Sequence, residues 1–448
     1  MTEPIQTALT AVELREAELL AWGAVGAEWT RDELAAVLDM QGAGEALLAE
    51  MLDSALIVET PTGGYRSRSA ETVRLLAGLR QAFRQEAVLS GRPLVLDYRF
   101  LQRPRRRPRR DVPAADLEAA AQGTLGASGL AALRALAPTT VSAFQKRSTG
   151  QILRALDSKD AAGIMVTAGT GSGKTLAFYM PALAWICENS GADGVLALAL
   201  YPRNELLKDQ LRALVYYASQ LRGLGGRVFP VTLGTWFGST PSSAKAVREG
   251  RLDSWRKVPS GYICPFLRCP DPACEDGDLV WPHAELKSGT ELLRCLKCAG
   301  EVPGGVLRLT RESARREPPR VMLSTTESLN RQLSSPGNLR AFGVAAHGLR
   351  AVLLDEVHTY EGTTGAQNAY LFRRLRAALG YQPVWAGLSA TLADAGEFFG
   401  RLVDLDAVRV TVIEPDPSEL EETGAEYLVA LRHNPPGNAG TLSTTIKA

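Results

Sequence analysis

The segment from Thr167 to Thr175 constrains this chain more than any other part of its sequence. It reads Thr-Ala-Gly-Thr-Gly-Ser-Gly-Lys-Thr and lies between an apolar run at 164–166 and a predicted helix at 176–185. Glycines at alternate positions let the backbone turn so that successive N–H groups face one anion. The helix that follows presents its positive N-terminus to the same anion. The pattern therefore predicts a phosphate-binding loop of the P-loop type.

The C-terminal end of this loop carries two residues with expected roles. Lys174 is long enough to reach the terminal phosphates of a nucleotide, and the hydroxyl of Thr175 suits a Mg²⁺ ligand. The strict P-loop pattern has glycine where this chain has Ala168. The predicted nucleotide-binding residues of the loop are Ala168, Gly169, Thr170, Gly171, Ser172, Gly173, Lys174 and Thr175.

Length and composition indicate a globular chain of several domains. Its 448 residues suggest about two to four domains. The hydrophobic share of 45% and the charged share of 22% are ordinary. No apolar run approaches the ~20 residues of a membrane span, and the acidic start does not resemble a signal peptide. We therefore expect a cytoplasmic protein with no membrane partner. Because the net charge is only +1, contact with nucleic acid would depend on local patches.

The first ninety residues predict a small helical module. Helical spacing at 11–25, a helix after Thr30 and a third candidate at 44–54 precede a strand, a Gly-Gly turn and a second strand at 55–68. Three helices and a hairpin indicate a winged-helix-like module at 1–90, which binds duplex DNA or has a structural role. The predicted recognition helix is acidic, so the two interpretations have equal weight.

A basic linker is predicted at 91–139, because residues 103–110 read Arg-Pro-Arg-Arg-Arg-Pro-Arg-Arg. Proline disfavours a helix and the charges repel one another, which indicates an extended, solvated segment. Contact with a phosphate backbone is the alternative.

From residue 140 onward, apolar strand patterns alternate with helical patterns. This alternation predicts a parallel α/β domain at 140–407. A segment rich in cysteine, proline, glycine and charge interrupts it at 240–310. Residues 408–448 are expected to form a further linker and the start of another domain.

Two acids end the apolar run at 351–354, in the order Asp355-Glu356-Val357-His358. In P-loop proteins the first acid holds Mg²⁺ and the second orients the attacking water. The segment 389–391, Ser-Ala-Thr, follows another predicted strand, and its hydroxyls would link the nucleotide site to a neighbouring domain.

These three segments resemble motifs I, II and III of superfamily 2 DExH-box helicases, whose phosphate loop also has alanine at the position of Ala168. The resemblance covers residues 140–405. It implies a RecA-like fold and ATP-driven movement on nucleic acid, with ATP and Mg²⁺ as cofactors. The implied catalytic residues are Lys174, Asp355, Glu356 and His358, and the implied coupling residues are Ser389, Ala390 and Thr391.

Further segments of the chain resemble other motifs of this superfamily. Phe144 and Gln145 lie where the family places an adenine-reading glutamine. Residues 201–210 resemble motif Ia and residues 324–329 resemble motif Ib, which contact a nucleic-acid backbone. The implied nucleic-acid-binding residues are Arg203, Asn204, Thr325 and Thr326.

The segment from Tyr360 to Leu375, the cysteine-rich insert and the N-terminal module narrow the resemblance. Together they resemble the large bacterial helicases of phage-defence and DNA-modification islands, of the DISARM type or the deazaguanine (Dpd) type. DNA as substrate and subunits of such a system as partners are implied. An RNA helicase and a non-motor subunit that binds ATP and nucleic acid are the alternatives. A P-loop kinase or metabolic ATPase is disfavoured, because Asp-Glu-Val-His and Ser-Ala-Thr occur together.

Five of the six cysteines cluster in a short stretch, which in a cytosolic chain is typical of metal binding. Thiolates near two turns can form a tetrahedral Zn²⁺ site. Cys295 and Cys298 are the first expected ligands, and His283 is a further candidate. An iron–sulfur cluster and unliganded thiols are the alternatives. The zinc would take four of Cys264, Cys269, Cys274, Cys295 and Cys298.

Superfamily 2 motors close ATP between two RecA-like domains, the second of which supplies an arginine finger. Residues 441–446 resemble the first strand of that second domain. We therefore expect this chain to be the N-terminal part of a motor whose second half acts in cis or in trans. Alone, it is expected to hydrolyse ATP slowly and not to unwind a duplex.

Overall fold

The computed structural model describes residues 3–39, 44–79, 94–158, 160–169, 171–222, 231–344, 348–390 and 392–433. The chain divides into two compact units. Unit 1 comprises Met1–Arg107 and Glu421–Ala448, and unit 2 comprises Pro108–Leu420. Each unit has its own buried apolar clusters.

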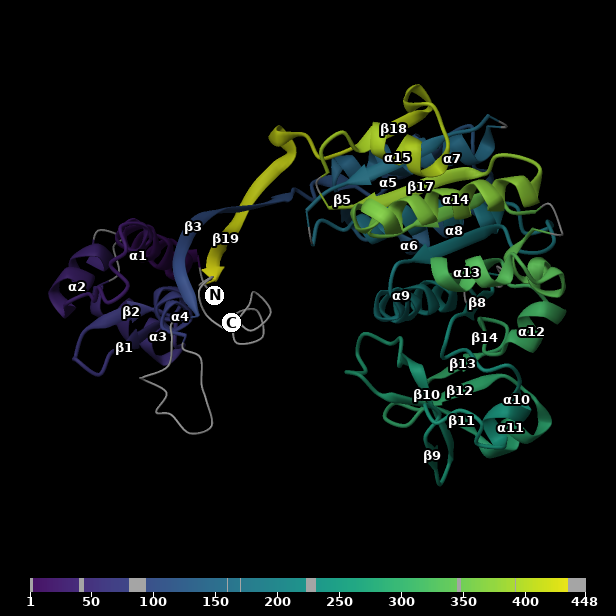
Figure 1. Ribbon diagram of the computed structural model, residues 1–448, viewed down its shortest axis with the longest axis horizontal. Helices are drawn as coiled ribbons and strands as arrows, with labels where there is room; N and C mark the ends of the chain where they lie inside the picture. Colours follow the sequence, from purple (N-terminus) through teal and green to yellow (C-terminus); the bar gives the residue numbers. More distant parts are fainter. Residues whose placement is uncertain are drawn as a thin grey trace. The chain divides into compact units, whose positions relative to one another are not determined.

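An eight-stranded sheet forms the centre of unit 2 (Figure 1). Its neighbouring strands all run parallel, in the order β14-β8-β15-β7-β16-β17-β6-β18. The predicted RecA-like parallel sheet is thereby confirmed. The strands are β6 (Gly163–Thr167), β7 (Ala197–Tyr201), β8 (Leu233–Trp236), β14 (Leu307–Arg308), β15 (Val321–Thr325), β16 (Ala351–Leu354), β17 (Val384–Ser389) and β18 (Val410–Ile413).

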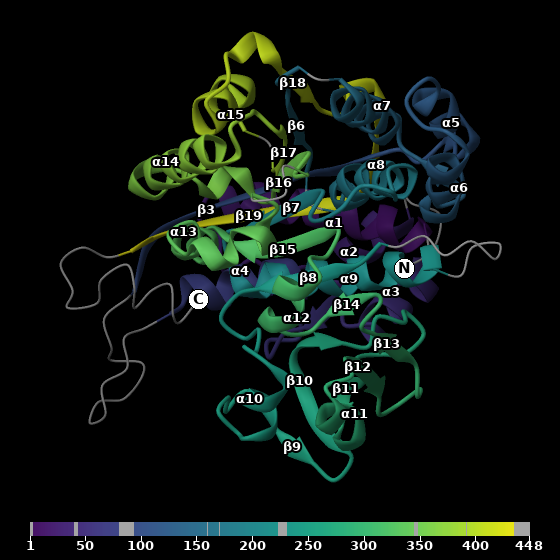
Figure 2. The same cartoon turned by 90° about the vertical axis from the view of Figure 1, so that its right-hand side faces the viewer.

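Helices cover both faces of this sheet (Figure 2). One face packs against α5 (Ala115–Ala121), α6 (Ala127–Leu136), α7 (Ala143–Asp157), α8 (Lys174–Glu188) and α9 (Asn204–Arg222). The other packs against α12 (Arg311–Arg316), α13 (Thr326–Gln332), α14 (Gly362–Leu379) and α15 (Ala395–Val403). Because both faces are buried, the strands read as nearly continuous apolar runs in the sequence.

Side chains along a single strand show how the two layers are separated. In β6, Ile164 and Val166 belong to the cluster on the α8 side, whereas Met165 belongs to the cluster on the α14 side. A Cβ at Gly387 would lie 2.7 Å from the ring of Phe399 and 2.9 Å from the sulfur of Met165. Glycine in β17 therefore lets α15 approach the sheet closely.

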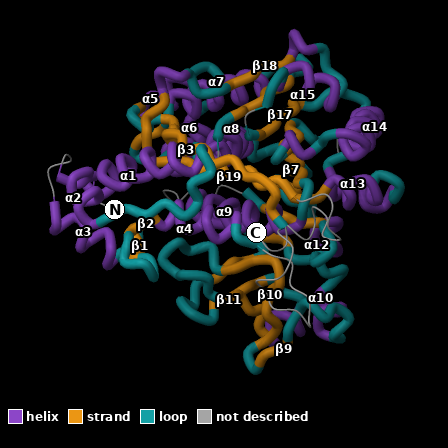
Figure 3. The backbone as a smooth tube through the Cα atoms, turned by 60° about the vertical axis from the view of Figure 1, so that its left-hand side comes forward, coloured by secondary structure: helices purple, strands orange, loops and turns teal. Residues whose placement is uncertain are grey.

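A second sheet lies within the segment that interrupts the α/β domain (Figure 3). Its strand order is β13-β12-β11-β10-β9, and its apolar side chains join the cluster on the α9 side of the central sheet. The helices and strands of the inserted segment are α10 (Ala244–Arg248), β9 (Lys257–Val258), β10 (Gly261–Arg268), β11 (Asp278–Pro282), α11 (His283–Ser288), β12 (Leu292–Cys295) and β13 (Glu301–Pro303).

Unit 1 begins with three helices and a hairpin, in the order predicted for a winged-helix-like module. These are α1 (Glu3–Ala21), α2 (Arg31–Asp39), α3 (Gly44–Asp53) and the antiparallel pair β1 (Ile57–Glu59) and β2 (Tyr65–Ser67). A fourth helix, α4 (Arg68–Ala77), follows directly, with the side chain of Ser67 accepting a hydrogen bond from the N–H of Ala70. In α3 the charged residues Glu45, Glu50 and Asp53 are all acidic.

The structure differs from the predicted linker at 91–139. Residues 95–108 form a long strand, β3 (Val95–Pro108), which pairs with β19 (Leu420–His433). Further along, β4 (Val112–Pro113) pairs with β5 (Thr140–Val141), and α5 and α6 pack into the core of unit 2. The expected linker at 408–448 likewise contains β18 and β19, and residues 434–448, including the expected strand at 441–446, lie outside the described residues.

The pairing of β3 with β19 changes the interpretation of the basic run. Arg103 forms an ion pair with Glu426 at 2.9 Å, and Arg106 forms one with Glu422 at 3.3 Å. Glutamates of β19 therefore neutralise part of the basic run in β3.

Glu13 on α1 makes the stability of unit 1 depend on pH. It is 3% exposed, and burial raises its pKa from 4.5 to about 7, although a hydrogen bond from Ser69 opposes the shift. The folded state thus holds an extra proton between these values, so stability falls as pH rises from 4.5 to 7. We expect Glu13→Gln to stabilise unit 1 at pH 8 by about 1–3 kcal/mol and to flatten this dependence.

The measurement is hydrogen exchange of the α1 amides across pH, with exposed Glu18→Gln on the same helix as the control. Equal pH dependence in wild type and Glu13→Gln would contradict the assignment.

Candidate functional site

The parallel strands bring the predicted motif segments to one edge of the central sheet. The loops after β6, β7, β15, β16 and β17 all leave from the carboxyl ends of their strands. In open α/β sheets this edge is where ligands bind. Segments more than 200 residues apart in the sequence, such as those at 168–175 and 389–390, therefore meet.

The phosphate loop connects β6 to α8, as predicted. Gly171 and Gly173 have φ angles of +75° and +87°, a backbone conformation that favours glycine. The N–H of Ala168 donates to the carbonyl of Ser389 at 3.3 Å, which joins the loop to the end of β17. Thr170 lies outside the described residues.

Lys174 folds across this loop. Its Nζ donates to the carbonyl oxygen of Ala168 at 2.6 Å. Burial lowers the pKa of Lys174, and the nearby carboxylates of Glu356 and Asp355 oppose that shift. The side chain thus lies where a phosphate would compete for its ammonium group. Thr175 follows in the first turn of α8.

The acidic pair follows β16 directly. Asp355 is 8% exposed, and burial raises its pKa to about 6. Its Oδ1 accepts a hydrogen bond from the N–H of Glu356 at 2.9 Å. Glu356 itself has a φ of +48°, a left-handed conformation that costs of order 1 kcal/mol in a residue other than glycine. This turn holds two carboxylates of different environment side by side, close enough to Lys174 to act on its pKa.

His358 connects the acidic turn to β17. Its Nδ1 lies 3.2 Å from Oγ of Ser389 and 3.3 Å from Oε2 of Glu356. A shift of Ser389 at the end of β17 would therefore be transmitted to Glu356 through the side chain of His358. Ala390 follows Ser389, and Thr391 lies outside the described residues.

Phe144 and Gln145 have buried positions at the start of α7. Phe144 is 0% exposed and lies in the apolar core of unit 2, so it packs there rather than facing a nucleotide as predicted. Gln145 is 2% exposed. Its amide accepts from the N–H of Ser142 at 2.9 Å and donates to the carbonyl of Gly173 at 3.0 Å. It thereby holds the phosphate loop against α7.

The residues predicted to bind nucleic acid lie at the same edge of the sheet. Arg203 and Asn204 are exposed where α9 begins. Thr325 is 6% exposed, and its Oγ1 accepts from the N–H of Ser328 at 3.2 Å, so it caps α13. Thr326 is half-buried at the first position of that helix.

Sequence reasoning missed the loop after β8, which leaves the sheet at this edge too. The guanidinium of Arg311 lies 5.6 Å from the ring centre of Trp236 and donates to the carbonyl of Phe237 at 2.9 Å. This loop follows β8 (Leu233–Trp236), and none of the motif segments predicted from the sequence includes it.

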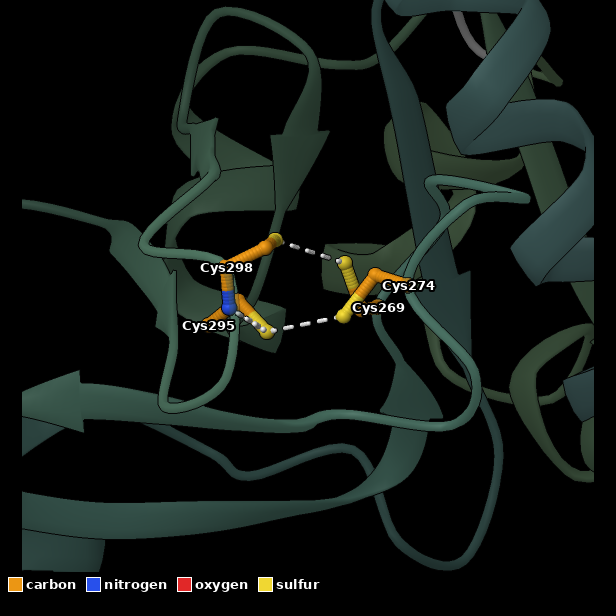
Figure 4. A group of neighbouring side chains, drawn as sticks. All are labelled: Cys269, Cys274, Cys295 and Cys298. Carbon is orange, nitrogen blue, oxygen red and sulfur yellow. Dashed lines mark hydrogen bonds between the residues drawn. The ribbon is translucent and has the colours of Figure 1, made fainter.

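Four cysteines converge between two turns of the insert (Figure 4). Their sulfur atoms all lie within 4.8 Å of one another. Sγ–Sγ distances of 3.6 Å separate Cys269 from Cys298 and Cys274 from Cys295. A Cβ at Gly277 would lie 2.5 Å from the sulfur of Cys295, so glycine is required beside the cluster.

Cys264 does not join this cluster. It lies in β10 and is 3% exposed, and burial raises its pKa to about 12. His283 also lies elsewhere, with its ring 5.7 Å from that of Tyr262. The structure thus reduces the five candidate cysteines to four.

Backbone N–H groups favour thiolate at one member of the cluster. Burial raises the pKa of Cys295, but the N–H groups of Cys298 and Lys297, together with the neighbouring thiols of Cys298 and Cys274, bring the pKa to about 7. A similar N–H of Gly300 points at the sulfur of Cys298 at 3.4 Å. Such donors favour the deprotonated ligands that a metal needs.

Among the described residues, no helix combines the length and the apolar character that crossing a membrane requires.

Comparison with known proteins agrees with this arrangement. Residues 130–238 match the DEAD/DEAH box helicase family. This part of the chain, which contains the loop between β6 and α8 as well as β7 and α9, is similar to the DEAD/DEAH box helicase domain.

Among curated proteins, the chain is similar to the Druantia protein DruE of Escherichia coli, with 27% identity over 272 residues. That alignment covers 51% of this chain and 15% of DruE. Among solved structures, the DUF1998 helicase MrfA bound to DNA and AMPPNP is 18% identical, with a TM-score of 0.44, over 76% of this chain and 34% of that one. The Mycobacterium smegmatis helicase Lhr bound to ssDNA and AMP-PNP is 20% identical, with a TM-score of 0.38, over 62% and 28%. The chain thus spans about a third or less of each of these proteins.

Proposed function

We propose that this chain is the ATP-binding half of a superfamily 2 DExH-box helicase or translocase that moves on DNA. The observation that carries the proposal is the convergence of Lys174, Asp355, Glu356 and Ser389 at one edge of the parallel sheet. A phosphate loop alone serves many activities. The combination with an acidic turn that is linked through His358 to the end of β17 is typical of a motor.

The residues present fit Mg-ATP. Lys174 would hold the terminal phosphates, and the hydroxyl of Thr175 and the carboxylate of Asp355 would hold Mg²⁺, which offsets the charge of the phosphates. Glu356 would orient the attacking water. Mg²⁺ would also favour the ionised form of Asp355, whose burial otherwise favours the neutral one.

The four-cysteine cluster fits Zn²⁺. Four thiolates at about 2.3 Å from a tetrahedral ion lie about 3.8 Å apart, close to the 3.6 Å between the sulfurs of each pair. We propose a structural zinc that holds the two turns of the insert together. An iron–sulfur cluster is the alternative ligand of the same cysteines.

Two partners complete the proposal. The described residues contain one RecA-like sheet, and we propose that a second such domain, in cis or in trans, closes over the nucleotide. We further propose that the motor belongs to a phage-defence or DNA-modification system; the sequence resemblance to the helicases of such islands and the similarity to DruE support this proposal.

The test is ATP hydrolysis with and without single-stranded DNA or RNA. If the chain is a motor domain, we expect DNA to stimulate hydrolysis severalfold, and the second RecA-like half to raise the rate by orders of magnitude. Glu356→Gln should lower hydrolysis by about a hundredfold or more while ATP still binds. Exposed Glu301→Gln on β13 of the insert is the matched control.

Different results would identify the alternatives. Stimulation by RNA alone would indicate an RNA helicase. Binding of ATP and DNA without turnover, even with the second half present, would indicate a non-motor subunit.

A further inference from the structure

Arg110 ends the basic run at 103–110, and its exposed guanidinium differs from those of Arg103, Arg106 and Arg109, which have partners. Arg103 and Arg106 form ion pairs with β19. Arg109 pairs with Asp111 at 3.5 Å and donates to the carbonyl of Ser418 at 2.9 Å. Arg110 is exposed, and no hydrogen bond or ion pair joins its side chain to another residue that the structure describes.

The local fold fixes where this arginine lies. Val112 pairs with Val141 across β4 and β5, and the N–H of Ala114 donates to the carbonyl of Thr139. These bonds hold the segment that contains Arg110 beside the start of α7.

Gln145 in that first turn of α7 donates to the carbonyl of Gly173. A Cβ at Gly173 would lie 2.5 Å from Nε2 of Gln145 and 3.4 Å from Nη2 of Arg110. The guanidinium of Arg110 thus lies against the residue that caps α8 and immediately precedes Lys174.

The negative charge of a bound nucleotide and of the two nearby carboxylates favours a further cation beside the loop at Gly173. ATP carries about four negative charges at neutral pH, and Mg²⁺ offsets about two of them. The loop supplies Lys174, but Asp355 and Glu356 face the same lysine. One side-chain cation against two carboxylates and a polyphosphate leaves the site short of positive charge.

We propose that Arg110 is a nucleotide-binding residue, which supplies the second side-chain cation to the phosphate chain of the bound nucleoside triphosphate. The inference rests on the ATP site proposed above. An exposed, unpaired guanidinium beside the loop makes charge-assisted hydrogen bonds to phosphate oxygens without first breaking a bond within the protein.

The test is calorimetric titration of the full chain with Mg-ATP and with magnesium tripolyphosphate, which has the phosphate chain but no base or ribose. We expect Arg110→Ala to weaken the binding of both ligands by about tenfold, and Arg110→Lys to recover part of the loss. Arg109→Ala removes the same charge one residue away and is expected to change affinity less than about twofold.

Equal affinities in wild type and Arg110→Ala would overturn the proposal. A loss for ATP but not for tripolyphosphate would overturn it too, because Arg110 would then contact the base or ribose. If wild type binds no ATP at all, the proposed function itself fails, and the Lys174→Ala variant then shows no further loss.

Discussion

Replacing Lys174 by alanine is expected to weaken the binding of Mg-ATP by about a hundredfold. The ammonium group is partly buried and bonded only to the carbonyl of Ala168 among the described residues. A phosphate would give it a much stronger, charge-assisted partner. Because burial disfavours the charge of this lysine in the free protein, Lys174→Ala should not lower the melting temperature.

Calorimetry measures the affinity, and exposed Lys287→Ala in the insert is the matched control for loss of one positive charge. If Lys174→Ala binds Mg-ATP as tightly as wild type does, the loop between β6 and α8 is not the nucleotide site.

Replacing Cys295 or Cys298 by serine is expected to abolish zinc binding. The wild-type chain should contain about one zinc, because four thiolates form one closed tetrahedral site. The binding free energy of a structural zinc is folding free energy of the residues around it, of order 10 kcal/mol. Residues 261–303 should therefore lose protection against hydrogen exchange, whereas the affinity for ATP should be largely unchanged.

Elemental analysis of the purified proteins measures the metal. Cys264→Ala is the control, since Cys264 lies outside the cluster, and it should retain the zinc. Iron in the wild type, or zinc retained by Cys298→Ser, would contradict the proposed site.

Local sequence order made much of the candidate site predictable. The phosphate loop and the acidic turn each depend on a strand that ends and a turn or helix that begins within a few residues. Their common edge follows from the parallel strands. Such features could be predicted because the conformation and the chemistry lie in the same short segment.

Contacts between distant segments could not be predicted in this way. The sequence predicted a solvated linker at the arginines of β3, because their acidic partners lie more than 300 residues away in β19. Phe144 was predicted to contact the nucleotide because it precedes Gln145. In the structure its side chain is buried in the core behind α7. The spacing of the five cysteines did not exclude Cys264, because only the strand β10 shows which way its side chain points.

The pairing of β3 with β19 also sets an order of events during synthesis. The first strand of this ribbon leaves the ribosome about 300 residues before the second, at a synthesis rate of roughly 5–20 residues per second. For that interval the helices of unit 1 exist without their last strand, while the whole of unit 2 emerges and can fold. The arginines of β3 stay without their glutamate partners until β19 emerges, so the nascent chain carries an unpaired basic strand that the finished protein does not.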